Sequence, residues 1–191
     1  MNDFTLFFLS IIIILILIKK IFLNSNLITV VSKKDGKRYI VRDLENSQQA
    51  ADKLSDINKN ILFLIDNLDK SNESVLRLKN NYKINSLFEN SKYSQHTSYS
   101  LNKGEKIALC LREKNNELTF IDENTIMFVV IHELAHLMSE SIGHTKEFWD
   151  NMRLLIEVAS KLGIYKIIDY KKENTEYCGT TIKSTPYNFE K

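Results

Sequence analysis

The sequence predicts an α+β domain in which a small sheet covers one long buried helix, with a separate apolar helix ahead of it. Three observations support this fold class. The run 4–18 is almost entirely Phe, Leu and Ile, the segment 106–113 alternates with the period of a strand, and the segment 124–141 is apolar almost all round. A chain of 191 residues can hold one such domain and an appendage.

The overall composition excludes some classes of protein. The net charge is +2, which gives no electrostatic case for a nucleic-acid binder, so we expect no direct binding of nucleic acid. One proline and five glycines argue against a loop-built or low-complexity chain. Two cysteines, Cys110 and Cys178, are too few for a disulfide scaffold, and we expect both to be reduced thiols.

The N-terminal segment predicts a membrane anchor. The stretch FTLFFLSIIIILILI, residues 4–18, has only two polar residues, and the lysines after it can snorkel so that 21–23 extend the buried length. We therefore expect a transmembrane helix at 1–23, in contact with the membrane through residues 4–23. A cleaved signal peptide is the alternative, but the first three residues carry no positive charge and no small-x-small cleavage site follows.

The charges around this segment predict its orientation. Lys19 and Lys20 follow the apolar run and Asp3 precedes it. The positive-inside rule therefore predicts a single-pass protein with residues 24–191 on the cytosolic side. Reduced cysteines agree with that location. In a virus, the same side of the membrane can become the interior of the virion.

The first part of the remaining chain, 24–90, predicts a hairpin and two helices. Asp35 and Gly36 lie between alternating segments, which is a strong hairpin signal. Over about 46–68 the apolar residues recur at the spacing of one helix face, and a shorter helix is expected at 73–82.

The second part, 91–170, carries the candidate site and is followed by an irregular C-terminal tail at 171–191. The stretch FENSKYSQHTSYSLNKG, residues 88–104, predicts a polar loop with His96 on the surface. Two strands and then two helices are expected after it, at 106–113, 117–122, 124–141 and 145–162. A helix that is apolar almost all round, like the first of these two, is normally central and buried.

This buried helix carries the pattern H-E-L-A-H. His132 and His136 lie one turn apart on one face, so both imidazoles can bind the same metal ion. Glu133 lies beside the first histidine, where its carboxylate can take the proton of a water on the metal. Zinc suits this set because it lowers the pKa of such a water toward 7. Histidines satisfied by hydrogen bonds within an ordinary helix are the structural alternative.

A third metal ligand must come from beyond the helix. At 1.5 Å per residue, a continuous helix would carry His144 about 12 Å along the axis from His136, too far to share a metal with it. Gly143 permits the chain to turn back, which makes His144 the favoured third ligand. The alternative third ligands are Glu140, Glu147 and Cys110. A further alternative is that Cys178 approaches the metal as an inhibitory thiolate.

With these residues, the chain resembles the WLM and SprT-like families of zincin-fold metalloproteases. The matching elements are H-E-L-A-H at 132–136, Gly-His at 143–144 and the aromatic EFW at 147–149, within a similarity over about 95–165. The resemblance implies a zincin-like catalytic core, one Zn²⁺ per chain held by the three histidines, and Glu133 as general base. The compact anchored form also looks like proteins encoded by large DNA viruses.

The expected function is that of a membrane-anchored zinc endopeptidase with a protein or peptide substrate. Zn²⁺ would be held by His132, His136 and His144, and Glu133 would take the proton of the attacking water. Two alternatives share this site: a zinc-stabilised, catalytically inactive scaffold or binding protein, and a zinc amidohydrolase that does not act on proteins. The intact Glu133 argues against the scaffold, because a structural site needs no such carboxylate.

Overall fold

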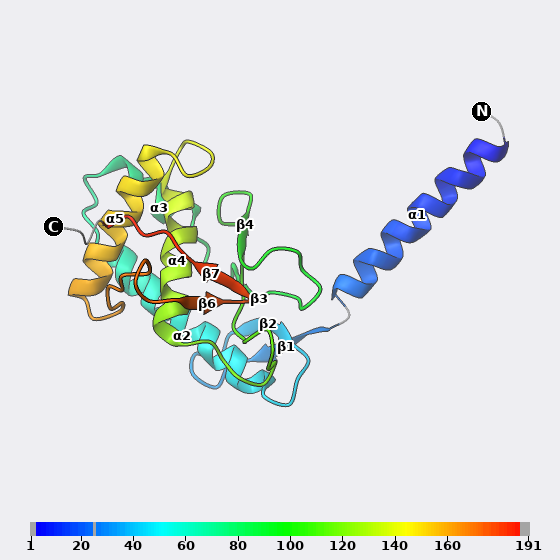
Figure 1. Ribbon diagram of the computed structural model, residues 1–191, viewed down its shortest axis with the longest axis horizontal. Coiled ribbons are helices and arrows are strands. Elements are labelled where there is room, and N and C mark those ends of the chain that lie inside the picture. Colours follow the sequence, from blue (N-terminus) through cyan, green and yellow to red (C-terminus); the bar gives the residue numbers. More distant parts are fainter. Residues whose placement is uncertain (1–2, 25, 188–191) are drawn as a thin grey trace.

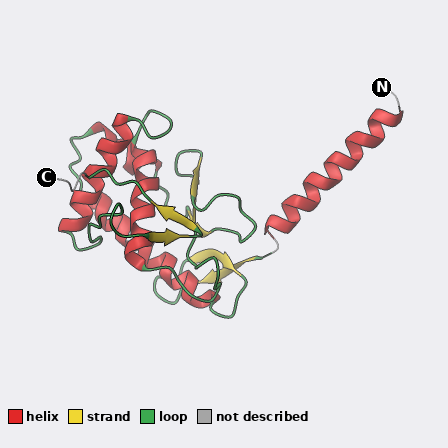
Figure 2. Ribbon diagram, viewed as in Figure 1, coloured by secondary structure: helices red, strands yellow, loops and turns green. Residues whose placement is uncertain are grey.

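The computed structural model describes residues 3–24 and 26–187. The elements in chain order are α1 Asp3–Asn24, β1 Leu27–Val31, β2 Arg38–Arg42, α2 Ser47–Asp66, α3 Glu73–Asn81, β3 Leu87–Glu89, β4 Tyr99–Leu101, β5 Lys106–Leu109, α4 Glu123–Met138, α5 Lys146–Lys161, β6 Thr175–Tyr177 and β7 Thr180–Ile182. Figure 1 shows one helix extending away from a rounded body that holds the other elements, and Figure 2 shows strands and helices side by side in that body, with α2 running below β1 and β2. The main sheet has the order β1-β2-β3-β5-β4, and β6 pairs with β7 in a second sheet.

The N-terminal helix α1 overturns the predicted membrane anchor. Within residues 3–24 and 26–187, no helix is both long enough and apolar enough to cross a membrane. The run 4–18, which holds no charged residue, would rise only about 22 Å as a helix, against a hydrocarbon core of about 30 Å, and Lys19 closes it. The predictions of a single-pass anchor at 1–23 and of a cytosolic side for 24–191 are therefore wrong. The first two residues of that predicted anchor lie outside the described residues.

The main sheet begins with the predicted hairpin. β1 and β2 pair antiparallel, starting with Leu27 opposite Arg42, and Gly36 in the turn has a φ of +70°. β3 and β5 continue the sheet in parallel, and β4 pairs antiparallel with β5 at the edge. β4 lies within 88–104, which we predicted as a loop. The sequence did not reveal this strand, because three residues are too few to show a hydrophobic period.

Helices α2 and α4 bury the apolar side chains that the sequence predicts for the core. Leu54 and Ile61 of α2 are fully buried, as are Ile131 and Leu134 of α4. Each such side chain contributes about 1.5–3 kcal/mol to folding through its removal from water. α4 therefore lies centrally, as expected of a helix that is apolar almost all round.

The ends of α4 are set by side chains. Asp122 caps its start and accepts a hydrogen bond from the Thr125 amide at 3.0 Å. The helix ends at Met138, three residues before the predicted end, because Ser139 has extended backbone geometry and its hydroxyl donates to the carbonyl of Ala135 at 2.8 Å. This earlier end frees the following residues to form a loop.

Two other predicted elements differ from the structure. The segment 117–122 forms an isolated β-bridge in place of a strand. The predicted irregular tail 171–191 contains the β6–β7 hairpin, whose two turn residues, Cys178 and Gly179, both have positive φ. Such a two-residue turn fits a hairpin, but a cysteine in the first position gives no sequence signal for it.

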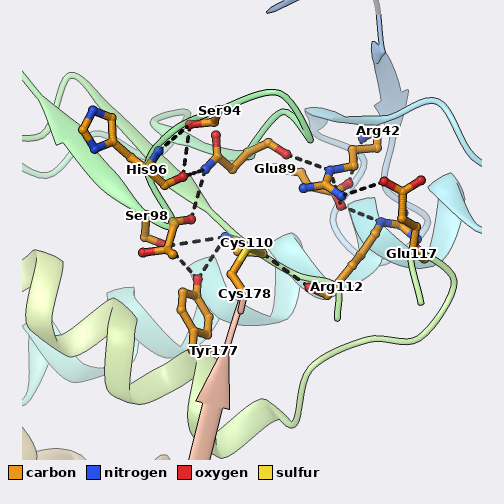
Figure 3. Close-up of a disulfide and its surroundings, with 12 residues drawn as sticks. Arg42, Glu89, Ser94, His96, Ser98, Cys110, Arg112, Glu117, Tyr177 and Cys178 are labelled. Atoms are coloured by element: carbon orange, nitrogen blue, oxygen red, sulfur yellow. Dashed lines mark hydrogen bonds and ion pairs between the residues drawn. A yellow bond between two sulfur atoms is a disulfide. The ribbon is translucent and has the colours of Figure 1, made fainter. Parts of the chain in front are cut away.

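The prediction of reduced cysteines is also wrong. Cys110, directly after β5, forms a disulfide with Cys178 in the turn of the β6–β7 hairpin (Figure 3). The two residues are 68 apart in the sequence, and their Cα atoms are 6.1 Å apart. The number of cysteines cannot reveal such a bond, because the return of the hairpin to β5 is what brings the sulfur atoms together.

Candidate metal centre

Three histidine side chains meet at the C-terminal half of α4. His132 and His136 lie one turn apart on this helix, and their Nε2 atoms are 3.2 Å apart. His144, from the loop after α4, brings its Nε2 atom to 3.1 Å from that of His132. The three ligand atoms all lie within 4.8 Å of one another. The structure thus brings together the three histidines named from the sequence, while the fourth, His96, is exposed elsewhere.

The geometry and charge of this cluster fit one metal ion. Zinc binds imidazole nitrogen at about 2.0–2.1 Å, so two nitrogens of a tetrahedral site lie about 3.3 Å apart. The two separations from His132, 3.2 and 3.1 Å, are close to this value, and the third pair lies within 4.8 Å. Burial, with a smaller contribution from the neighbouring imidazoles, lowers the pKa of His132 to about 3. Burial likewise lowers the pKa of His136. Both rings are therefore neutral at pH 7, and neutral imidazole is the form that binds metal.

The loop 139–145 turns the chain back toward α4. Gly143 has a φ of +85°, in the left-handed region that glycine adopts at little cost, as the sequence led us to expect. The carboxylate of Glu147 accepts hydrogen bonds from the amides of Glu140 and Ser141, at 2.9 and 3.1 Å, and from Ser141 Oγ at 2.6 Å. These bonds, that of the Ser141 hydroxyl above all, lower the pKa of Glu147 to about 2. Glu147 thereby holds the loop in the shape that returns its histidine to the helix.

The alternative third ligands are engaged elsewhere. Glu140 pairs with Arg77, with 2.6 Å between the carboxylate and the guanidinium. Glu147 holds the loop and is not part of the cluster that could bind a metal. Cys110 and Cys178 are bonded to each other, so neither offers a thiolate as a ligand or as an inhibitor.

Phe148 forms an apolar floor beneath the histidines. Its side chain is fully buried, and its ring centroid lies 4.4 Å from that of His136, 4.9 Å from that of His132 and 4.7 Å from that of His144. The residue belongs to the first turn of α5, which Thr145 caps. The aromatic residue Phe148 of the EFW stretch thus packs against the three imidazoles, and this packing restricts their rotamers.

Glu133 directly follows His132 in α4 and is almost out of contact with water. Its side chain is buried, and this burial raises its pKa to about 7, whereas a hydrogen bond with the hydroxyl of Ser100 opposes the rise. Ser100 belongs to the edge strand β4. We did not identify Ser100 from the sequence, and no spacing could have revealed it, because the contact joins two distant segments of the chain.

The fold and the three-histidine cluster together point to one protein family. A family model, the WLM domain, matches residues 37–188, and the chain belongs to the WLM family. The chain is similar to the uncharacterized protein R325 of Acanthamoeba polyphaga mimivirus, with 37% identity over 154 residues that cover 77% of this chain and 78% of that protein. It is also similar to the uncharacterized protein 136R of Invertebrate iridescent virus 6, with 36% identity over 69 residues, 36% of this chain and 38% of that protein. The predicted resemblance to proteins of large DNA viruses is confirmed.

The fold is also similar to that of a protein of known structure. The crystal structure of Wss1 from Saccharomyces cerevisiae matches with a TM-score of 0.51 and 24% identity, over 64% of this chain and 89% of the Wss1 chain. This likeness confirms the predicted α+β fold, and the match of the WLM model confirms the resemblance to that family. Membership of this family supports a metalloprotease-like function.

Proposed function

We propose that the chain is a zinc-dependent endopeptidase. The observation that carries this proposal is the convergence of three imidazoles on one point. Glu133, which directly follows His132 in α4, is buried next to the first of them in the sequence. One zinc ion per chain, bound by His132, His136 and His144, would polarise a peptide carbonyl and acidify a water. Three protein ligands leave a fourth position open, as in hydrolytic zinc sites, whereas structural sites usually have four protein ligands.

Glu133 is the general base in this proposal. It directly follows His132 and is buried, so its carboxylate can take the proton of the attacking water and pass it to the leaving amine with little competition from solvent. The hydroxyl of Ser100 orients this carboxylate from the side of β4. An inactive scaffold would have no use for a buried carboxyl group here, because removing such a group from water costs free energy.

The position of β4 at the edge of the main sheet favours a peptide as the substrate. β4 is the last strand in the order of the main sheet, so its outer edge can pair with an extended peptide. Ser100, in the middle of this strand, reaches Glu133, and a peptide paired along the edge would therefore pass close to the catalytic carboxylate. This arrangement favours a protein or peptide over the small amide that a non-protease amidohydrolase would take.

The test separates the metal ligands from the base in the full chain. Glu133→Gln should keep one zinc per chain and lose about 10³-fold in kcat, because an amide cannot take the proton of the water. His144→Ala should lose zinc affinity and cleavage together. Zinc content by elemental analysis and cleavage of a quenched-fluorescence peptide library are measured on the same samples.

The matched control for this test is Glu123→Gln. It makes the same chemical change at the exposed start of the same helix, where the carboxylate pairs with Lys53 at 2.7 Å, and it should behave as the wild type. Cleavage by Glu133→Gln at the wild-type rate would contradict the mechanism. A zinc-loaded wild type that cuts no member of the library would contradict the endopeptidase.

A further inference from the structure

We propose that the Cys110–Cys178 disulfide is a redox-controlled clamp on the catalytic site. In the oxidised protein, the clamp holds β4 and its Ser100 in place beside Glu133, and reduction of the disulfide releases them and lowers the rate of catalysis. The inference rests on the proposed function, because the site under control is the proposed catalytic one.

The disulfide encloses the whole candidate metal centre in one covalent loop. Its two cysteines are 68 residues apart, and the chain between them includes α4, the loop with His144 and α5. The hairpin β6–β7 forms a sheet of its own, separate from the main sheet. The bond between Cys178 in its turn and Cys110 after β5 therefore tethers this hairpin to the main sheet (Figure 3).

Tyr177, next to Cys178, connects the disulfide to the start of β4 through hydrogen bonds. Its side chain is 3% exposed, and its hydroxyl accepts a hydrogen bond from the Cys110 amide at 2.9 Å and lies 2.6 Å from Ser98 Oγ. Figure 3 shows this hydroxyl pointing at both groups. Burial raises the pKa of Tyr177, so its hydroxyl keeps its proton at neutral pH.

The contact with Ser98 reaches the catalytic carboxylate through β4. Ser98 directly precedes β4, in which Ser100 lies opposite Ile107 of β5. The Ser100 hydroxyl is near enough to Glu133 to lower its pKa. β4 has a strand partner on one side only. The Tyr177 hydroxyl supports its start together with the Cys110 amide, 3.4 Å from Ser98 Oγ, and Asn90, which donates to the Thr97 carbonyl at 3.0 Å. Loss of that support should displace Ser100 from Glu133. The metal should stay bound, because its proposed ligands come from α4 and the loop after it.

The turn that holds Cys178 depends on the disulfide for its shape. Cys178 has a φ of +52°, a region that residues other than glycine rarely adopt, and Gly179 follows with a φ of +78°. Turns of this kind usually have Asn or Asp followed by Gly, and cysteine has no side-chain hydrogen bond that favours the same conformation. Once the disulfide is broken, the constraint on this residue is lost and the hairpin can move away from β5.

A small thiol can reach the disulfide from the side of Cys178. Cys110 is fully buried, whereas Cys178 is half-buried and lines a cavity of about 680 Å³. The charged residues of this cavity are Lys114 and three acids, Glu113, Asp122 and Glu176, so a reductant without net negative charge is favoured. The thiolate of such a monothiol attacks Cys178 Sγ, and Cys110 leaves as a thiolate and takes a proton. A second monothiol attacks the mixed disulfide, which releases the Cys178 thiol and the oxidised reductant. Two electrons and two protons pass to the protein in total.

The first experiment follows the zinc-loaded full chain through cysteamine redox buffers. Peptide cleavage, free thiols by alkylation and mass spectrometry, and zinc content are measured on the same samples. We expect kcat to fall at least fivefold as two thiols appear, with zinc unchanged at one per chain, and to recover on reoxidation. An unchanged kcat with both thiols free, or a loss of zinc in step with kcat, would overturn the clamp.

The second experiment removes the Tyr177 hydroxyl and leaves the disulfide intact. Tyr177→Phe should lower kcat at least threefold in the oxidised protein, with KM and zinc content unchanged, because Tyr177 is a positioning residue. The matched control is Tyr165→Phe, which removes another buried hydroxyl, one that bonds to Tyr170 at 3.4 Å, and it should retain the wild-type kcat. Equal values of kcat for Tyr177→Phe and the wild type would contradict the path through this hydroxyl.

Hydrogen exchange separates failure of this inference from failure of the proposed function. On reduction, the amides of 98–101 and 175–182 should exchange at least tenfold faster, whether or not a substrate is known. An oxidised, zinc-loaded protein that cuts nothing contradicts the endopeptidase, and faster exchange in these two segments would still support the clamp. Unchanged exchange in both segments after full reduction contradicts the clamp, whatever the activity.

Discussion

The histidine cluster and the disulfide region are built in opposite ways. The cluster comes from one short stretch, 132–144, in which helix geometry and a single turn set the distances between the imidazoles. In the disulfide region, Ser98, Cys110 and Tyr177 come from three separate segments and meet only because the sheet and the hairpin pack together. A change in the first region should therefore alter metal affinity, and a change in the second should alter stability and the placement of the catalytic carboxylate.

The largest expected effect is on metal binding. His136→Ala should lower zinc affinity by about 10²–10³-fold, because it removes one of three proposed ligands. The unfolding free energy of the zinc-free protein should change by only about 1 kcal/mol, because the side chain is partly exposed. Competition with a chelator and urea unfolding in EDTA measure the two quantities. His96→Ala is the control, and equal affinity of the two variants would place the metal elsewhere.

The disulfide should give the reverse pattern. Under oxidising conditions, Cys178→Ser should lower the unfolding free energy by about 4 kcal/mol, because the unfolded chain is no longer restrained by a long covalent loop. Its zinc affinity should stay within a few-fold of the wild type. Urea unfolding with and without reductant provides the control, since the variant and the reduced wild type should coincide. A large loss of zinc affinity would show that the two regions are not separable.

A variant of Glu147 tests whether the loop 139–145 positions His144. The contribution of Glu147 to stability also depends on pH. Glu147→Gln should lower zinc affinity about tenfold, because the amide holds the Glu140 and Ser141 amides less firmly. The pKa of Glu147 is lowered in the folded protein, from 4.5 to about 2. Its contribution to stability is therefore fully present above pH 4.5 and is lost as the pH falls toward 2.

The measurement is acid unfolding of the zinc-free protein between pH 5 and about pH 2. The wild type should lose more stability across this window than Glu147→Gln does. Glu140→Gln is the matched control: its carboxylate, like that of Glu147, pairs with Arg77, but the amides of Glu140 and Ser141 donate to Glu147. Identical acid profiles for the wild type and Glu147→Gln would rule out the loop-holding role.

The smallest expected effect is at Gly143. A Cβ there would meet no atom within 4 Å, so Gly143→Ala should cost only the left-handed backbone, about 1 kcal/mol, and lower zinc affinity about threefold to fivefold. Gly36→Ala is a close match, with a φ of +70° and equally open space, but lies in the β1–β2 turn away from the metal centre. The two variants should lose similar stability, and only Gly143→Ala should lose zinc affinity. Equal zinc affinities would show that the turn does not position His144.

Several features could be predicted from the sequence because they depend on local geometry. The period of a helix converts the spacing of His132 and His136 into a shared face, and the same period places the apolar side of α2. The need for a turn at Gly143 followed from the rise of the helix alone. By contrast, the predicted anchor was wrong because the apolar run is too short for a membrane once Lys19 and its neighbour close it.

The sequence by itself determined the α+β class, the family and the group of residues that can bind a metal, because each is encoded in neighbouring residues. Only the tertiary structure decided that Cys110 pairs with Cys178, that Tyr177 reaches Ser98, and that Ser100 contacts Glu133. The physical reason is that sheet pairing and hairpin docking depend on the burial of the whole core, and no period or spacing along the chain records which distant segments will meet.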